Sequence, residues 1–265
     1  MNETELIEKC INLKPYVHNN ELIKSLRKLI KNKYDDIFFC VLVHGSVATN
    51  EIIPYSDFDG LIIVKDKFIG SIELNDFIHD SMEIIYEFDP LQHHGWSIMS
   101  DNKLKDYPQT YFPHEIFAYS RIINPEKKIT FKISFNSNIN YSKPLFSHLK
   151  DIEKKVINNI YPKNIYQLKS FLSELMLIPT LYIQAKNFKG VFKKQSFSMA
   201  KKDFSDKSWN PIQIASRVRQ DWSYDLNPVQ KIISKNQNNY LIRELNKRFL
   251  APKIPKHICD TINDD

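Results

Sequence analysis

The stretch that most constrains the fold of this chain is 41–65, in which two apolar runs lie on either side of a polar segment. The runs cover 37–43 and 61–64 and are rich in β-branched and aromatic residues. Such runs, when bounded by turn residues, predict buried strands, here over 36–43 and 58–65. The second strand begins inside the polar segment, so polar residues are expected at the rim of a sheet.

Two aspartates, Asp57 and Asp59, stand at the start of this second strand. Side chains alternate along a strand, so both carboxylates are predicted to point to one side, with Phe58 on the other. Two carboxylates held side by side repel each other unless a cation lies between them. Mg²⁺ is the usual cation where oxygen ligands also meet phosphates, and two-metal phosphoryl-transfer sites hold their ions roughly 4 Å apart. The pair therefore predicts a magnesium site.

The turn between the two strands carries Gly45 and Ser46. A glycine lets the backbone approach a ligand closely, and the serine adds a hydroxyl group. A short helix is expected to start over 47–50, and the free N–H groups of a helix N-terminus can bind a phosphate. The turn is thus predicted to bind phosphate beside the metal site.

The Gly45 and Ser46 turn, followed after a gap by Ser56, Asp57 and Asp59 and an apolar strand, resembles the signature of the DNA polymerase β-like nucleotidyltransferase superfamily. The minimal and antibiotic-modifying nucleotidyltransferases are the most similar members in size and layout. The resemblance covers about the first third of the chain. It implies that the aspartates are catalytic metal ligands, that the glycine and serines bind the nucleotide, and that two Mg²⁺ ions accompany the NTP. The alternative is a β-hairpin with two solvated aspartates.

A third strand is expected over 91–100, and here the sequence departs from the superfamily pattern. Many members carry a third carboxylate on this strand, yet no acid lies within 93–99. One alternative is that Asp89, at the mouth of the strand, is the third catalytic carboxylate and metal ligand. Another is that His93 or His94 replaces it as metal ligand, phosphate contact or base. The third is a site with two aspartates and a base elsewhere. A neutral imidazole is a poorer Mg²⁺ ligand than a carboxylate, which favours a proton or phosphate role for the histidines.

Length and composition fit one large domain or two small ones with an ordinary core, because 42% of the 265 residues are hydrophobic. The formal net charge of +6 favours anionic partners such as nucleotides or nucleic acid, or serves solubility alone. Cys10, Cys40 and Cys259 have no metal or redox spacing, which fits a reducing, cytoplasmic location. No signal peptide and no apolar run of ~20 residues is found, so no membrane segment is expected.

Outside the segments discussed above, the pattern of residues 1–134 indicates mostly helices. Apolar periodicity favours helices over 3–15 and 20–32. The segment 71–88 is expected to begin as a helix, with a passage into extended chain as the alternative, and to end at Asp89-Pro90 because a proline disfavours helix at the preceding residue. Loops and a short helix are expected over 101–127, and an edge strand over 129–134.

The polar, Asn-rich segment 135–142 is the best candidate for a domain boundary. The predicted fold class is α+β. A mixed β-sheet nucleotidyltransferase domain with flanking helices covers 1–135, and a helical bundle that clamps the nucleotide or substrate covers 143–265. The helices expected in the bundle are 144–160, 164–187, 211–222 and 227–249.

One acid, Glu174, lies within the nearly all-apolar helix 164–187, which Pro179 is expected to kink. A carboxylate buried among apolar residues has a raised pKa, which suits a general base. The antibiotic-modifying relatives take their base from a glutamate of the helical domain, so the resemblance implies this role. The alternatives are a solvent-facing glutamate or one paired with a cation from another helix.

A basic segment follows over 186–204, after Gly190 ends the long helix. Related enzymes use a lysine and a hydroxyl of the helical domain to hold the triphosphate, and lysine is a common phosphate binder. Lys193, Lys194 and Ser196 are therefore predicted nucleotide-binding residues. The alternative is a solvated surface helix.

These features together predict a metal-dependent nucleotidyltransferase that moves an NMP from an NTP to an acceptor and releases pyrophosphate. A small molecule such as an antibiotic or sugar is the expected acceptor. RNA or protein, as in toxin-type modifiers, is the alternative, and a non-catalytic nucleotide-binding module is a third possibility. Nothing in the sequence predicts an oligomeric state.

Overall fold

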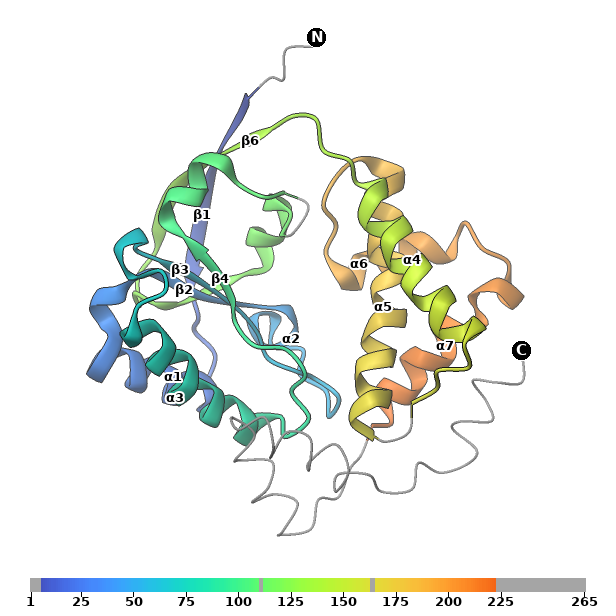
Figure 1. The fold of residues 1–265 in the computed structure, drawn as a ribbon, viewed down its shortest axis with the longest axis horizontal. Coiled ribbons are helices and arrows are strands. Elements are labelled where there is room, and N and C mark those ends of the chain that lie inside the picture. Colours follow the sequence, from blue (N-terminus) through green and yellow to red (C-terminus); the bar gives the residue numbers. More distant parts are fainter. Residues whose placement is uncertain (1–5, 110–111, 163–164, 223–265) are drawn as a thin grey trace. The chain divides into compact units, whose positions relative to one another are not determined.

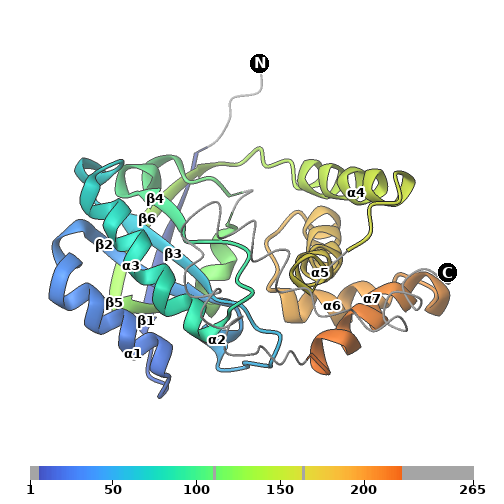
Figure 2. The ribbon, with the colours of Figure 1, turned by 60° about the horizontal axis from the view of Figure 1, so that its bottom comes forward.

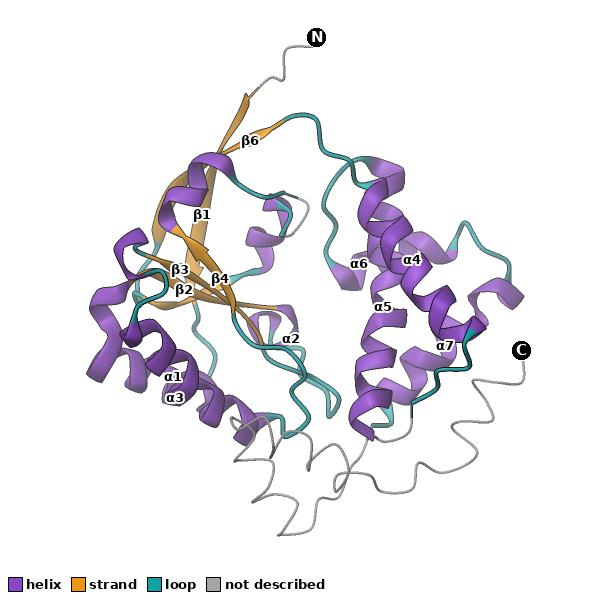
Figure 3. Cartoon of the chain, viewed as in Figure 1, coloured by secondary structure: helices purple, strands orange, loops and turns teal. Residues whose placement is uncertain are grey.

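The structure of this chain is a computed structural model, and the residues it describes are 6–109, 112–162 and 165–222. They divide into two compact units. The first, called the sheet unit, comprises Met1–Ile52 and Ser56–Ile139. The second, called the helical unit, comprises Ile53–Tyr55 and Asn140–Asp265. Among the described residues, all strands (orange in Figure 3) belong to the sheet unit.

Six strands form one mixed sheet in the order β4-β3-β2-β5-β1-β6. The strands are β1 (Leu6–Pro15), β2 (Phe38–His44), β3 (Asp59–Val64), β4 (Ser97–Ser100), β5 (Arg121–Asn124) and β6 (Ile129–Asn136). Two pairs are parallel, β3 with β4 and β1 with β5, and the other neighbours are antiparallel. The predicted mixed sheet with flanking helices is therefore confirmed.

The helices of the sheet unit are α1 (Glu21–Leu29), α2 (Gly45–Thr49) and α3 (Ile72–Phe88). Asn20 and Ser71 cap α1 and α3, because each side-chain oxygen accepts a hydrogen bond from a backbone N–H group of the first turn. A π turn over Ile30–Tyr34 continues α1. The predicted helices over 20–32 and 71–88 are thus confirmed, and α3 ends at Phe88, just before Asp89-Pro90, as expected.

Both faces of the sheet are buried over 40–43 of β2 and 61–64 of β3, which explains why these two stretches are apolar without interruption. In β2, Val41 and Val43 pack into one hydrophobic cluster, whereas Cys40 and Leu42 pack into another on the opposite face. Helices α1 and α3 cover the first face (Figures 1 and 2). The segment 101–119 contributes buried side chains to the second cluster.

The helix predicted over 3–15 is wrong for its described part, because Leu6–Pro15 forms strand β1. Its apolar residues fit a period of two as well, since Ile7, Ile11 and Leu13 lie on one face of a strand. β1 pairs with β6 along its length from Leu6 to Leu13. Backbone pairing with β6 and burial against the sheet outweigh the local helical pattern.

The third strand is shorter than the predicted 91–100, because β4 covers only its last four residues, Ser97–Ser100. The residues before it form a loop that begins at Asp89-Pro90. A further strand, β5, was not predicted, because four residues are too few to show an alternation. The edge strand predicted over 129–134 is confirmed as β6.

The helical unit contains the helices α4 (Ser142–Ile157), α5 (Ile165–Asn187), α6 (Lys193–Lys201) and α7 (Asp206–Gln220). Two predicted helices, 144–160 and 164–187, are confirmed as α4 and α5. Helix α7 begins before the predicted start at 211, because Ser205 caps it by accepting a hydrogen bond from a backbone N–H group. The helix predicted over 227–249 lies outside the described residues.

Tyr55 packs among residues of the helical unit, although it lies between two stretches of the sheet unit. Its hydroxyl donates to the backbone oxygen of Lys169 and lies 2.7 Å from Oγ of Ser173. The guanidinium carbon of Arg219 lies 4.5 Å from the centre of its ring, and the ring of Trp222 meets it edge-on at 5.1 Å. Within the described part of the chain, no helix combines the length and apolar character needed to span a membrane.

Candidate active site

The pairing of β2 with β3 brings the two halves of the predicted motif together. In this antiparallel pair, His44 lies opposite Asp59. The residue after His44 is Gly45, so the turn follows directly at the rim where the aspartates stand. Asp57 and Asp59 are both partly buried, whereas Phe58 is fully buried on the other face. The predicted alternation is therefore confirmed.

Gly45 makes room for Asp59. Its φ of +66° lies in the left-handed region that favours glycine. A Cβ atom added there would lie 2.3 Å from Oδ2 of Asp59, far inside contact distance. The glycine thus serves the close approach of a carboxylate. Helix α2 begins at Gly45 itself and spans only five residues, so it starts earlier than the predicted 47–50.

The two carboxylates converge on one imidazole nitrogen. Nε2 of His94 lies 3.2 Å from Oδ2 of Asp57 and 3.6 Å from Oδ1 of Asp59. Burial lowers the pKa of His94, but the hydrogen bond to Asp57 and the negative charges of Asp59, Asp57 and Asp89 outweigh it, so this pKa lies above its usual value. An imidazole N–H therefore stands where a cation between the carboxylates is expected.

Gln92 contacts both Phe58, which lies between the two aspartates in the sequence, and His94. Its buried side chain pairs with the backbone of Phe58: Oε1 accepts from the N–H group at 2.9 Å, and Nε2 donates to the carbonyl oxygen at 2.9 Å. Nε2 also lies 2.9 Å from the carbonyl oxygen and 3.1 Å from Nδ1 of His94. A glutamine in a polar loop gives no signal of its own in the sequence, except that it lies two residues before His94.

Three side chains at this rim offer ligand atoms for a metal ion, one carboxylate and two imidazoles. One ligand atom from each of Asp57, His93 and His94 lies within 4.8 Å of the others. The ring of His93 also meets that of His94 edge-on at 4.7 Å. The two convergent carboxylates supply the oxygen ligands that Mg²⁺ prefers, and the partly buried position keeps them accessible.

Asp89 has a structural role that the sequence did not predict. Its side chain is 1% exposed, and its Oδ1 accepts a hydrogen bond from the backbone N–H of Leu91 at 3.1 Å. The carboxylate thus stabilises the turn that leads into the loop of Gln92. Its role as a third metal ligand stays a prediction, whereas His94 is in direct contact with the aspartate pair.

His44 is a further histidine near the aspartates. Burial and the charge of His94 lower its pKa to about 4, against an opposing effect of Asp57. Its ring meets that of Phe112 edge-on at 4.8 Å, and its buried Nδ1 has no hydrogen-bond partner among the described residues. His44 is therefore neutral near pH 7.

The two predicted serines differ in accessibility. Ser46 is partly exposed in the first turn of α2. Ser56 is 7% exposed and directly precedes Asp57. Ser46 therefore offers the more accessible hydroxyl for a phosphate, while the nucleotide-binding role of both serines stays a prediction.

Glu174 in α5 is paired with a cation from another helix. Nζ of Lys155 in α4 lies 2.5 Å from Oε2 of Glu174, and His148 of α4 contacts its backbone oxygen at 2.8 Å. The isolated, apolar surroundings expected for a general base are therefore not found. The structure matches the alternative in which a neighbouring helix supplies the partner.

The predicted phosphate-binding residues of α6 have different surroundings. Ser196 is fully buried: its hydroxyl donates to the backbone oxygen of Lys193 at 2.6 Å and lies 2.9 Å from Oγ1 of Thr180. Its expected access to a phosphate is not found, because these contacts tie it to α5 and to its own helix. Lys193 and Lys194 are exposed at the start of α6, and their phosphate role stays a prediction.

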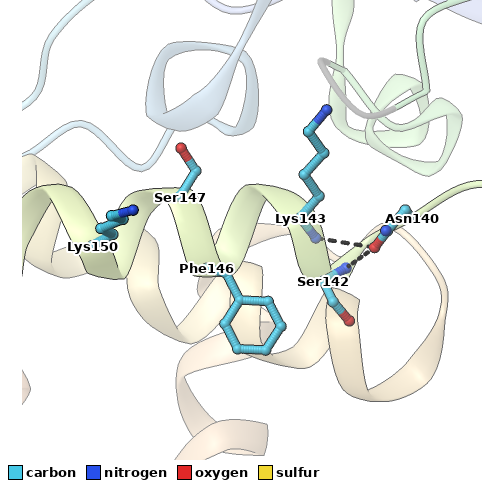
Figure 4. Close-up of a pocket in the computed structure, with 6 residues that line it drawn as sticks. All are labelled: Asn140, Ser142, Lys143, Phe146, Ser147 and Lys150. Carbon is cyan, nitrogen blue, oxygen red and sulfur yellow. Dashed lines mark hydrogen bonds between the residues drawn. The ribbon is translucent and has the colours of Figure 1, made fainter.

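A hollow in the helical unit lies along the first turns of α4 (Figure 4) and contains none of the predicted site residues. Its lining residues are Asn140, Ser142, Lys143, Phe146, Ser147 and Lys150. Oδ1 of Asn140 accepts hydrogen bonds from the backbone N–H groups of Ser142 and Lys143, each at 3.1 Å. These contacts stabilise the turn that leads into α4.

No protein family description and no curated protein matches this chain. Among solved structures, it is similar to a spectinomycin adenyltransferase, AAD(9), from Enterococcus faecialis, whose crystal structure contains ATP and spectinomycin. The TM-score is 0.42 at 12% sequence identity, over 87% of this chain and 99% of the other. A likeness of this size does not establish a shared fold, so a function has to be derived from the residues of this chain.

Proposed function

We propose that this protein is a metal-dependent nucleotidyltransferase, which moves an NMP from an NTP to an acceptor and releases pyrophosphate. The observation that carries the proposal is the contact of Gly45 with Asp59, where a Cβ would lie 2.3 Å from the carboxylate oxygen. This contact joins a turn with an accessible serine to a pair of convergent carboxylates. An enzyme that binds a nucleoside triphosphate through a cation needs both parts, the turn for the phosphates and the carboxylates for the cation.

The aspartates would hold the metal. Asp57 and Asp59 point to one side of β3 and approach the same nitrogen of His94, so a divalent cation between them would replace that N–H. When bound, Mg²⁺ would neutralise phosphate charge and polarise the α-phosphate. Asp89 is proposed only as a nearby charge, because its carboxylate stabilises a turn.

The remaining residues of the rim would orient the substrate. Ser46 would donate its hydroxyl hydrogen to a phosphate oxygen, and His94 is near enough to the aspartates to do the same. Gly45 would keep Asp59 in place. Catalysis would consist mainly of positioning and charge stabilisation, in which aligned donors and fixed charges lower the barrier.

We propose a small molecule, such as an antibiotic or a sugar, as the acceptor, because the chain resembles the antibiotic-modifying nucleotidyltransferases in size and layout. RNA or protein is the alternative, which the net charge of +6 favours. A steep loss of RNA affinity with rising salt would support the RNA alternative, because phosphate contacts release counterions.

The first test is a titration with the four NTPs, with and without Mg²⁺, on the wild type and on Asp57→Asn/Asp59→Asn. We expect Mg²⁺-dependent binding in the wild type that the double variant loses, and in a parallel assay of pyrophosphate release a loss of transfer of at least about 10³-fold in the double variant. The matched control is Asp76→Asn, which neutralises an exposed aspartate of α3. NTP binding that is indifferent to both Mg²⁺ and the double substitution would contradict the proposal.

A further inference from the structure

A second hollow of the helical unit lies between α6 and α7, and none of the described residues that line it was predicted as a site residue. Its volume of about 360 Å³ is within the usual range of ligand pockets. One face of each helix forms a wall, because the lining residues repeat at helical spacing. They are Phe197 and Lys201 in α6, and Trp209, Gln213, Ser216, Arg217 and Gln220 in α7. We call this the α6–α7 hollow.

Aromatic side chains form the floor of the α6–α7 hollow. Trp209 is 2% exposed, and its ring meets that of Phe197 edge-on, with 4.9 Å between the ring centres. Phe204 also packs against Trp209, at 6.0 Å. Phe197 itself is only partly buried, so its ring is accessible from the hollow. A planar group that enters the hollow would therefore meet an aromatic surface that is fixed by packing.

Two cations stand at this hollow without an acid beside them. Lys201 and Arg217 are both exposed, and within the described ranges neither forms an ion pair. Asp203 is the acid nearest to Lys201 in the sequence, but it binds other groups: Nζ of Lys186 lies 2.6 Å from its Oδ2, and the hydroxyl of Tyr182 donates to the same oxygen at 3.2 Å. The described lining residues include no Asp or Glu. The hollow is therefore electropositive.

The positive charge of the chain is concentrated in these two helices. The segment 193–220, which spans α6 and α7, contains seven lysines and arginines and two aspartates, so its formal charge is +5, against +6 for all 265 residues. Charge that served solubility alone would be spread over the surface. Its concentration on two packed helices, around an aromatic floor, favours an anionic partner with planar groups.

We propose that the α6–α7 hollow binds one nucleotide of a single-stranded nucleic acid. Lys201 and Arg217 would contact the phosphates on either side of this nucleotide, and its base would stack on Phe197. The amides of Gln213 and Gln220 can donate and accept hydrogen bonds, as the edge of a base requires. An acidic peptide would pair with the cations but leave the aromatic floor unused. This inference goes beyond the proposed nucleotidyl transfer and does not depend on it.

The hollow along α4 is an internal control. Its volume is similar, about 390 Å³, and its described lining also has two lysines, Lys143 and Lys150, and no acid. Phe146 is its one aromatic lining residue among those described, and this side chain points away from Lys143 (Figure 4). It is 68% exposed, so no buried ring forms a floor there. The two hollows are thus matched in charge and differ in their aromatic residues.

The experiment measures the fluorescence anisotropy of a short fluorescein-labelled single-stranded RNA with the full-length protein, without Mg²⁺, at increasing salt concentration. Lys201→Gln/Arg217→Gln should reduce the slope of log affinity against log salt by about 1.4, because each phosphate contact of a single strand contributes about 0.7. Lys143→Gln/Lys150→Gln removes the same charge and should leave the slope unchanged. Equal changes in the two variants would show that net charge alone attracts the RNA and would overturn the proposal, as would a wild type that binds no RNA at low salt.

Stacking is tested by Phe197→Leu, which keeps an apolar side chain against Trp209 and removes the ring. We expect the affinity to fall about tenfold, the effect of one lost stack, at an unchanged salt slope. Phe146→Leu in α4 is the matched control and should have no effect. If Phe197→Leu does not fold, Gln213→Ala/Gln220→Ala on the exposed face of α7 should weaken binding about fivefold. An unchanged affinity in the folded variant, or equally tight binding of a duplex of the same sequence, would refute a stacked base.

The two proposals can fail separately. Asp57→Asn/Asp59→Asn should bind the RNA as the wild type does, because the α6–α7 hollow lies in the helical unit and the aspartates lie in the sheet unit. Loss of RNA binding in this variant would place the RNA at the rim of the sheet and overturn the role of the hollow. Binding of NTP that depends on Mg²⁺ and on the aspartates, in a protein without RNA affinity, would refute the hollow and retain the nucleotidyltransferase.

Discussion

The sheet unit and the helical unit use their chemically distinctive residues differently. At the rim of the sheet, Asp57, Asp59 and His94 approach one another and the side chains remain partly exposed. In the helical unit, the predicted base Glu174 pairs with Lys155, and Ser196 is buried against a neighbouring helix. The predicted residues of the sheet unit thus converge, whereas Glu174 and Ser196 of the helical unit each contact a neighbouring helix.

The difference follows from how each prediction was made. In the sheet unit, the prediction rested on two motif halves and on the strands that join them, so the register of β2 with β3 had to bring them together. In the helical unit, Glu174 was singled out because it contrasted with its apolar neighbours, and Lys193, Lys194 and Ser196 because they lie in a basic segment like that of related enzymes. A lone acid in an apolar helix obtains a partner from another helix as readily as it becomes a base.

Among the single substitutions, the largest effect is expected at Gly45, because Asp59 can approach the turn only where this residue has no side chain. Gly45→Ala would place a methyl group 2.3 Å from Oδ2 of Asp59 and displace the carboxylate. We expect transfer to fall by about 10²-fold, as for other small displacements in active sites. The measurement is the rate of pyrophosphate release from the preferred NTP.

The matched control for this substitution is Gly70→Ala. Gly70 also has a positive φ, +77°, but a Cβ added there meets nothing within 4 Å. Both variants should lose about 1–2 kcal/mol of unfolding free energy, the cost of a left-handed backbone for alanine. Equal losses of transfer in the two variants would show that backbone strain, and not the position of Asp59, limits the enzyme.

A second, intermediate effect concerns His44 and the pH dependence of stability. The pKa of His44 is about 4 in the folded protein, so the unfolded chain binds a proton on this side chain more readily. The stability that neutral His44 contributes is therefore fully present above about pH 6.5. This contribution is lost as the pH falls from about 6.5 to about 4. The ceiling is about 3 kcal/mol, and we expect about half of it because the side chain is not fully buried.

The measurement for His44 is urea unfolding over this pH range. The groups whose charge acts on the ring are His94 and Asp57. His44→Leu should reduce the decrease of unfolding free energy on acidification, while His79→Gln, an exposed histidine of α3, should not. Identical pH profiles for His44→Leu and the wild type would contradict a buried, neutral His44.

The smallest effect is expected in the helical unit, at Glu174. Glu174→Gln should leave transfer within about twofold and cost up to about 1 kcal/mol, because the pair with Lys155 is partly exposed. Lys155→Met should cost a similar amount, and the double variant little more than either single one. A strong loss of transfer with unchanged stability would identify Glu174 as the general base and remove the contrast between the units.

The sequence was sufficient to predict those elements whose structure follows from local side-chain alternation and from turn residues. It predicted β2, β3, α1, α3 and the position of the aspartates on one face. It failed for β1, because Ile7, Ile11 and Leu13 fit both a helix and a strand, and only the partner strand β6 selects between them. Such long-range pairing is not encoded in a local window.

Gln92 shows a second limit of the sequence. Its importance depends on the loop that replaces the first part of the expected third strand, so that a side chain takes up the backbone hydrogen bonds of Phe58. No periodicity and no motif marks such a residue.

The location of Tyr55 bears on how this protein can be divided. Because Ile53–Tyr55 groups with the helices, the chain passes between the two units on both sides of this segment and again after Ile139. Neither unit is therefore one continuous piece of sequence that a single cut or a single gene fusion could exchange. Tyr55 lies two residues before Asp57 in the sequence. A chain that ended after Ile139 would lack Lys169 and Arg219, both of which contact Tyr55. Exchange of the helical unit as a cassette would have to include this loop as well.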